Sequence, residues 1–181
     1  MTAPWRVPFE TALRAHAPLA ELQVATCSPE GMPSVRTVIL RGVSVEGFPY
    51  FFTDGRSRKA DHLRENPRVA LHAWFPLTRE QFRLSGRATL HGSQAEDPWA
   101  ELRQLGWAHL EPEARQPFVG APPGHLAITR VPVEVPAVAP PEFLLVSVEV
   151  TDADWLALGP PPSRAGFRKV GASWIQQALT P

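Results

Sequence analysis

The sequence contains one cysteine and no excess of either charge among its 181 residues. Cys27 has no partner for an internal disulfide, which suits a protein of the reducing cytoplasm. A nucleophilic Cys27 is the functional alternative, but a small side chain near the end of a strand is the simpler interpretation. The 18 basic residues balance the 18 acidic ones. Because nucleic acids and anionic membranes both attract a basic excess, neither is expected as a partner.

Long apolar runs and the signatures of several enzyme classes are also missing. No run approaches the roughly 20 apolar residues of a membrane span, and the N-terminus has no apolar signal-peptide core. There is no GxGxxG, P-loop, CxxC, HExxH or GxSxG motif, and the six histidines lack metal-ligand spacing. The sequence therefore predicts a cytoplasmic protein without a bound metal, and it gives no sign of nucleoside triphosphate turnover or serine hydrolase chemistry.

Proline, by contrast, is abundant, with 21 residues that cluster towards the C-terminal half. The segment 116–141 is too apolar for a free linker and too rich in proline for a central strand. We predict that this segment is a loop that lies over the body of the protein or reaches a partner subunit. A chain of this length suits one domain with a sizeable core, so 1–181 is expected to form a single domain.

Short strands dominate the predicted secondary structure. Strict alternation in 80–91 predicts an antiparallel strand whose buried face carries Phe82, Leu84, Gly86, Ala88 and Leu90. The polar face of this strand is either solvated or meets a ligand or partner; it carries Arg83, Arg87 and His91. Further strands are predicted at 19–26, 35–43, 48–53, 69–75 and 143–150, with one or two more in 165–179. The predicted fold class is mainly β, a six- to seven-stranded antiparallel barrel with short peripheral helices.

The stretch 33–59, PSVRTVILRGVSVEGFPYFFTDGRSRK, predicts a β-hairpin that leads into a helix. Ser57 stands at the expected N-cap, and Arg58 and Lys59 follow it. Arg36 lies in the apolar first strand, where a cation needs an acid or a ligand as its partner. Helix N-termini bind phosphate through free N–H groups, and nearby cations strengthen that binding. We expect these cations to converge on the phosphate of a small molecule; a plain N-cap is the alternative for Ser57.

Three segments, RTVILRG, YFFTDGRSRKADHLRENPRVALHAWF and REQFRLSGRA, resemble the pyridoxamine 5'-phosphate oxidase family and its relatives with the FMN-binding split-barrel fold. The resemblance covers 22–90 and resumes at 143–181. The arginine-led strand, the T-x3-SRK turn and the R-x-Q-x-R-x-x-G strand are specific in combination. The stretch WAHLEPEARQPFVGAPPG is more similar to a branch with an FMN-binding domain and no proven oxidase activity than to the vitamin B6 enzyme.

The resemblance implies FMN as the cofactor and a homodimer with FMN at the interface. It implies a phosphate site at Arg36 and the Ser57–Lys59 turn, and a glutamine, Gln81, that reaches the flavin from the neighbouring subunit. From the residues alone, Gln81 is an ordinary exposed strand residue and Trp155 a core residue. The full set expected to contact FMN is Arg36, Thr37, Val38, Ile39, Leu40, Phe52, Thr53, Ser57, Arg58, Lys59, Gln81, Trp155 and Arg164.

The substrate residues of the vitamin B6 oxidase are not matched. Arg41 stands where the family has a lysine for the substrate phosphate, which keeps the charge but alters the geometry. Trp107, Glu111 and Arg115 stand in the region of a Tyr, Arg and Ser set, and 162–163 replaces a His-containing motif. Because Glu111 would repel a phosphate, we predict that the flavin site persists while the pyridoxamine phosphate site does not.

The leading hypothesis is an FMN-binding protein that acts as a flavin-dependent oxidoreductase on an unidentified small molecule. No residue is nominated as a general acid or base. One alternative is a non-catalytic flavin-binding or stress-response protein on the same fold. Another is a split-barrel protein that uses a deazaflavin or haem, and haem would require an axial histidine.

Overall fold

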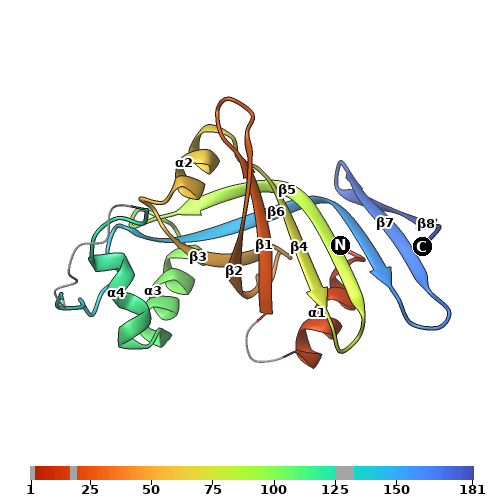
Figure 1. Ribbon diagram of the computed structural model, residues 1–181, viewed down its shortest axis with the longest axis horizontal. Coiled ribbons are helices and arrows are strands. Elements are labelled where there is room, and N and C mark those ends of the chain that lie inside the picture. The colour runs from red at the N-terminus through yellow and green to blue at the C-terminus, as the bar shows by residue number, and fades with distance from the viewer. Residues whose placement is uncertain (1–2, 17–19, 125–132) are drawn as a thin grey trace.

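The computed structural model describes residues 3–16, 20–124 and 133–181 of the chain (Figure 1). In chain order its elements are α1 (Arg6–Ala15), β1 (Ala20–Cys27), β2 (Pro33–Val43), β3 (Pro49–Asp54), α2 (Arg58–Glu65), β4 (Arg68–Phe75), β5 (Glu80–His91), α3 (Trp99–His109), α4 (Pro112–Val119), β6 (Phe143–Ala157), β7 (Ser163–Val170) and β8 (Ser173–Leu179). None of these described helices has the length and apolar character that a membrane span requires.

Six antiparallel strands form a closed barrel. Their order is β3–β2–β1–β4–β5–β6, and β3 also pairs with β6, which closes the sheet on itself. β7 and β8 continue the sheet beyond β6 as a hairpin, on the side of the barrel opposite α3 and α4 (Figure 1). The predicted antiparallel barrel is thus confirmed. The segment 152–157 is the second half of the 15-residue strand β6 and no separate element.

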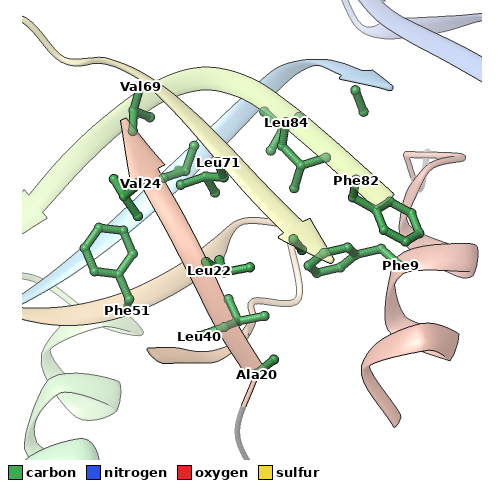
Figure 2. Packing of buried hydrophobic residues seen from close by; sticks show 14 of the residues in the cluster. Phe9, Ala20, Leu22, Val24, Leu40, Phe51, Val69, Leu71, Phe82 and Leu84 are labelled. Carbon is green, nitrogen blue, oxygen red and sulfur yellow. The ribbon is translucent and has the colours of Figure 1, made fainter. Parts of the chain in front are cut away.

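Alternating side chains of the barrel strands fill its interior (Figure 2). On β5 the burial alternates as predicted, with Phe82 and Leu84 inside. Helix α1 covers one end of the barrel and inserts Phe9, whose ring lies 5.1 Å from that of Phe82 in an edge-to-face arrangement. Fully burying one such side chain contributes about 1.5–3 kcal/mol. Because Phe9 and the buried strand residues belong to one contiguous cluster, the strands and α1 share a single core.

A second, smaller core lies where α3 and α4 pack on the outer face of the barrel. It is built around Trp107 and Phe143, whose ring centroids are 5.1 Å apart. Gly106 leaves no room for a Cβ because the Phe52 ring fills that position. The buried Arg103 donates to the carbonyls of 139, 140 and 143 and so fastens the chain that leads into β6 to α3. The core therefore fixes the helical region against β3 and β6.

The proline-rich segment is only partly a loop. Helix α4 begins with Pro112 in its first turn and extends to Val119, into the segment predicted to lack regular structure, with Pro117 inside the helix. Residues 136–139 lie against α3, where Trp107 donates to the carbonyl of Pro136 and Gln104 contacts Ala137 and Ala139. Residues 125–132 lie outside the described part of the chain.

Candidate functional site

The turn between β3 and α2 and the adjoining part of β2 bring three basic side chains close together. We call this the cation pocket and define it by Arg36, Thr53, Ser57, Arg58 and Lys59. Thr53 and Ser57 are buried, while Arg36 and Lys59 are partly covered and Arg58 is exposed. The cation pocket is thus a cluster of two buried hydroxyl side chains, two half-buried cations and one exposed cation.

Arg36 belongs to the row of β2 side chains that face the barrel interior, together with the buried Val38 and Leu40. Its guanidinium donates to Thr26 Oγ1 at 2.8 Å and to the carbonyl oxygen of Val24 at 3.1 Å. The other terminal nitrogen donates to Ser34 Oγ at 2.8 Å. All of these partners are neutral, so the charge of Arg36 is oriented but not neutralised by the protein.

Lys59 reaches back from the first turn of α2 to the hydroxyl groups of the cation pocket. Its ammonium donates to Thr53 Oγ1 at 2.9 Å and to Ser57 Oγ at 3.3 Å. None of the seven ion pairs among the described residues includes Arg36, Arg58 or Lys59. Three cations thus meet without a bound carboxylate, which is costly unless an external anion joins them.

The electrostatics agree with this arrangement. Burial lowers the pKa of Lys59, and the neighbouring Arg36 lowers it further, while Asp54 acts in the opposite direction. Burial, and then the charge of Arg58, also lowers the pKa of Arg36. Asp54 does not neutralise Lys59 because its carboxylate is held by Arg56 in a pair with an oxygen–nitrogen distance of 2.7 Å. The cation pocket is therefore an electropositive site that would favour an anion.

The start of α2 adds backbone donors to the pocket. Ser57 occupies the N-cap position with an extended backbone, but its hydroxyl donates to the Asp54 carbonyl at 2.6 Å and does not cap the helix. Among the described residues, the N–H groups of Arg58 and Lys59 have no acceptor. Ser57 is therefore the N-cap residue by position, as predicted, but its side chain makes no capping hydrogen bond. Two free N–H groups and the positive end of the helix dipole point towards an anion.

The donor set of the cation pocket fits a phosphate. Phosphate accepts several hydrogen bonds at once, and charged donors give the shortest and strongest of them. Arg36, Lys59 and the free N–H groups supply such donors, and Thr53 and Ser57 orient Lys59. A phosphoester could therefore bind here without any carboxylate of the protein having to move away.

The strand predicted to lie along the flavin presents two different faces. Val38 and Leu40 are buried in the barrel core, whereas Thr37 is exposed and Ile39 partly exposed on the outer face. Of these four predicted residues, only Thr37 and Ile39 could place their side chains against a ligand outside the barrel. Phe52 packs on the outer face of β3, between Phe143 and the guanidinium of Arg41, which lies 5.5 Å from the ring centroid.

The remaining predicted residues belong to a different part of the molecule. Gln81 lies on the outer face of β5, where its Oε1 is 3.4 Å from Nε2 of His72. Trp155 packs against the barrel core and donates to Glu80 at 2.8 Å, which agrees with the core alternative for this residue. Arg164 of β7 pairs with Asp154 at 2.8 Å. None of the contacts of these three residues involves the cation pocket.

A groove of about 720 Å³ runs between the outer face of the barrel and the β7–β8 hairpin. Polar side chains from both sides line it, including His72 and Arg83 of the barrel and Gln177 of the hairpin. Apolar groups such as Val35 and Ile175 also line it, and both are more than half exposed. The groove is thus a mixed apolar and polar surface next to Gln81 and Arg164.

Two buried residues beneath the cation pocket are not among those predicted from the sequence. Thr26 ends the inward row of β1 after Leu22 and Val24, and its hydroxyl contacts both Arg36 and His62. The signal was present in the sequence, because a polar residue at the inward end of an apolar alternation needs a partner. His62 gave no such signal, since its partner lies 36 positions away in the chain.

The part of the chain that forms this site is similar to known proteins. Residues 2–92, half of the chain, match the family model described as the FMN-binding domain of pyridoxamine 5'-phosphate oxidase. The chain belongs to this family. The matched residues include β1–β5, α2 and all of the cation pocket. A crystal structure of a pyridoxamine 5'-phosphate oxidase-related, FMN-binding protein from Nostoc punctiforme is 32% identical, with a TM-score of 0.88 and full coverage of both chains.

Curated relatives in the pyridoxamine 5'-phosphate oxidase family match over a shorter span. A pyridoxine/pyridoxamine 5'-phosphate oxidase of a Nostoc species is 44% identical over 80 residues, which are 44% of this chain and 37% of that enzyme. The enzyme of the same name from Rubrobacter xylanophilus is 38% identical over 112 residues, 58% of this chain and 51% of that enzyme. The chain thus matches about half or less of the length of these relatives.

Proposed function

We propose that this protein binds FMN and that the cation pocket holds its phosphate. The observation that carries the proposal is the meeting of Arg36 and Lys59 without a carboxylate partner, beside two free N–H groups of α2. Membership of the FMN-binding-domain family supports FMN as the phosphoester. The similar length and fold of the FMN-binding protein from Nostoc punctiforme support it over the whole chain.

The flavin ring then lies outside the barrel, next to the outer face of β2. Thr37 and Ile39 offer their side chains on that face, and the backbone of β2 fixes their spacing. A flavin is a large planar group, so burial of its apolar area against such a surface contributes binding energy that the phosphate contacts alone do not supply. Phe52 is held by the α3 core on the outer face of β3, the strand that pairs with β2.

The active form is a homodimer. Gln81, Trp155 and Arg164 have no contact with the cation pocket in their own protomer, so they would meet FMN held by a second copy. The groove beside the β7–β8 hairpin supports this arrangement because its exposed apolar side chains are suited to burial by another protein surface. Two symmetric sites would result from one such interface.

The proposed activity is that of a flavin-dependent oxidoreductase acting on a small molecule other than pyridoxamine phosphate. FMN supplies electron transfer when it is bound, and the protein supplies orientation and exclusion of solvent. Trp107 is fully buried, and Arg115 donates to the carbonyls of Ala108 and Leu110. Neither is free to bind a substrate phosphate, and the exposed Glu111 would repel one.

The absorption spectrum of the freshly purified protein is the direct test. A flavin spectrum that is released by denaturation and identified chromatographically as FMN is expected. A deazaflavin spectrum, a Soret band or a colourless protein that fails to bind added FMN would each overturn the proposal. Titration with FMN and with riboflavin adds a second criterion, because a phosphate site predicts much tighter binding of FMN.

Reduction of the bound flavin separates an enzyme from a flavin carrier. Anaerobic addition of NADH or NADPH, or of amine donors, is expected to bleach the flavin absorbance, and an electron acceptor such as a quinone should restore it. Bleaching with multiple turnovers supports the oxidoreductase. Tight FMN binding with no reduction by any donor tested would favour a non-catalytic flavin-binding protein.

A further inference from the structure

The guanidinium of Arg36 is held from below by a short chain of buried groups. Its Nη1 donates to Thr26 Oγ1 at 2.8 Å, and Thr26 Oγ1 lies 3.0 Å from Nδ1 of His62. Thr26 is 1% exposed and His62 6% exposed. The chain therefore connects β2, β1 and α2 in a region that solvent barely reaches, where a hydrogen bond strongly constrains geometry.

The directions of these hydrogen bonds follow from the donors available. Arg36 carries donors only, so Thr26 Oγ1 accepts from it. A threonine hydroxyl has a single proton, which is then free to be donated to His62 Nδ1. In this arrangement Nδ1 of His62 accepts, and both partners of Thr26 are satisfied. The opposite direction would leave the Thr26 proton without an acceptor among the contacts of this chain.

We propose that Thr26 and His62 are positioning residues for Arg36 and thereby set the affinity of the site for the phosphate of its ligand. The proposal rests on the proposed binding of FMN. His62 and Lys59 belong to the same helix, so the chain also fixes α2 relative to β2. An arginine loses considerable side-chain entropy when it is ordered, and these contacts order Arg36 before the ligand arrives.

Substitution of Thr26 tests this with two ligands that differ only in the phosphate. Thr26→Val is expected to raise the Kd for FMN about tenfold and to leave the Kd for riboflavin within about twofold. Thr26→Ser keeps the hydroxyl and should restore FMN binding to within about threefold of the parent protein. Thr11→Val, at an exposed position of α1, is the matched control and should change neither value.

A double substitution shows whether Thr26 acts through Arg36. In an Arg36→Ala background, Thr26→Val should have no further effect on the Kd for FMN, because the group that it positions is gone. Equal losses of FMN and riboflavin binding in Thr26→Val would overturn the proposal, as would an undiminished effect of Thr26→Val in the Arg36→Ala background. Failure of the parent protein to bind FMN would instead overturn the proposed function.

His62 provides an independent pair of variants should Thr26→Val not fold. In His62→Asn the amide oxygen takes the position of Nδ1 and can accept from Thr26, whereas His62→Leu offers no acceptor. We expect His62→Leu to weaken FMN binding about tenfold and riboflavin binding hardly at all, and His62→Asn to recover most of that loss. Identical FMN affinities for the Asn and Leu variants would contradict the proposed role.

Discussion

Basic side chains gather in two regions of this molecule, and the protein treats them differently. Along β5–β7 all the cations but the exposed Arg87 pair with a carboxylate: Arg83 and Arg164 share Asp154, and Arg168 pairs with Asp152. In the cation pocket the contacts of Arg36 and Lys59 go to hydroxyl and carbonyl groups alone. Carboxylates of the protein neutralise these cations of the first region, whereas no carboxylate of the described residues pairs with Arg36 or Lys59 in the second.

The difference between paired and unpaired cations indicates which of them bind a ligand. A paired surface cation contributes little beyond local order, typically about 0–1 kcal/mol. A half-buried, unpaired cation lowers the stability of the protein without its ligand, and this loss is recovered only when an anion binds. Hydrogen-bond partners, and not the mere presence of Arg or Lys, therefore favour the cation pocket as the place where an anion binds.

The largest expected effect follows from removing the unpaired cations. Arg36→Ala and Lys59→Ala should each weaken FMN binding about ten- to hundredfold, since each deletes a charged donor to the phosphate. Riboflavin affinity should change far less, and fluorescence titration with both ligands measures the ratio. Arg14→Ala, which removes a cation from the exposed end of α1, is the matched control. Unchanged FMN affinity in both pocket variants would show that the phosphate binds elsewhere.

Proton uptake by Lys59 on FMN binding is a second measure of the unpaired charge. Because the pKa of Lys59 is lowered in the ligand-free fold, part of the lysine is deprotonated below the ordinary pKa of about 10.4, and stability rises with pH across that interval. A bound phosphate dianion should raise this pKa again. Calorimetry at pH 9 in buffers of different ionisation enthalpy should show uptake of a fraction of a proton per FMN. Lys59→Met should abolish it; net release in the parent protein would contradict this reasoning.

A smaller effect is expected on the neutralised side. Burial alone would raise the pKa of Asp154, but hydrogen bonds from Arg164 and Arg83 outweigh burial and hold it below its ordinary value. The stability that this gives is present above the ordinary pKa of about 3.9 and is lost as the pH falls through the lowered value. Asp154→Asn should lower the Tm by about 2–4 °C at pH 7.

Acid pH provides the control for Asp154. The difference in Tm between Asp154→Asn and the parent protein should shrink as the pH falls below about 4, because the parent carboxylate then takes up its proton. Thermal unfolding followed by circular dichroism across this range measures both values. A difference that stays constant down to pH 2.5 would show that the substitution acts through packing and not through the charge.

The smallest effect is expected at Arg115, whose donors are engaged with carbonyls at the end of α3. Arg115→Ala should leave the Kd for FMN within about twofold of the parent value, because no hydrogen bond to the phosphate is removed. Its Tm should fall slightly, since the side chain also lies over the ring of Trp107. A large loss of FMN affinity would mean that the ligand binds near α4.

The sequence predicted the barrel and the meeting of its cations because both depend on local pattern. Alternation gave the buried face of β5, and the hairpin followed by a helix start placed Lys59 near Arg36. It did not predict the route of the Ser57 hydroxyl, which prefers the Asp54 carbonyl to the helix N–H groups. Such a choice between nearby acceptors depends on turn geometry, which a residue pattern does not specify.

Features that depend on distant residues were also beyond the sequence. β6 continues through a bulge at Thr151: Ser85 pairs with Asp152 and Gly86 with Val150, and the carbonyl of Glu149 takes the space that a Cβ at Gly86 would need. The contact between Thr26 and His62 and the bond from Arg103 to the start of β6 join segments far apart in the chain. These pairings are set by how the barrel closes.

Arg56 connects the turn after β3 to the end of α4. It pairs with Asp54 within the turn and also donates to the carbonyls of Pro117, Phe118 and Gly120 at the end of α4. The turn that shapes the cation pocket and the last turn of a helix some sixty positions later are thereby joined. Amide hydrogen exchange at the turn and at the end of α4 should therefore slow together when a ligand binds in the cation pocket, so that exchange at α4 reports on binding at the turn.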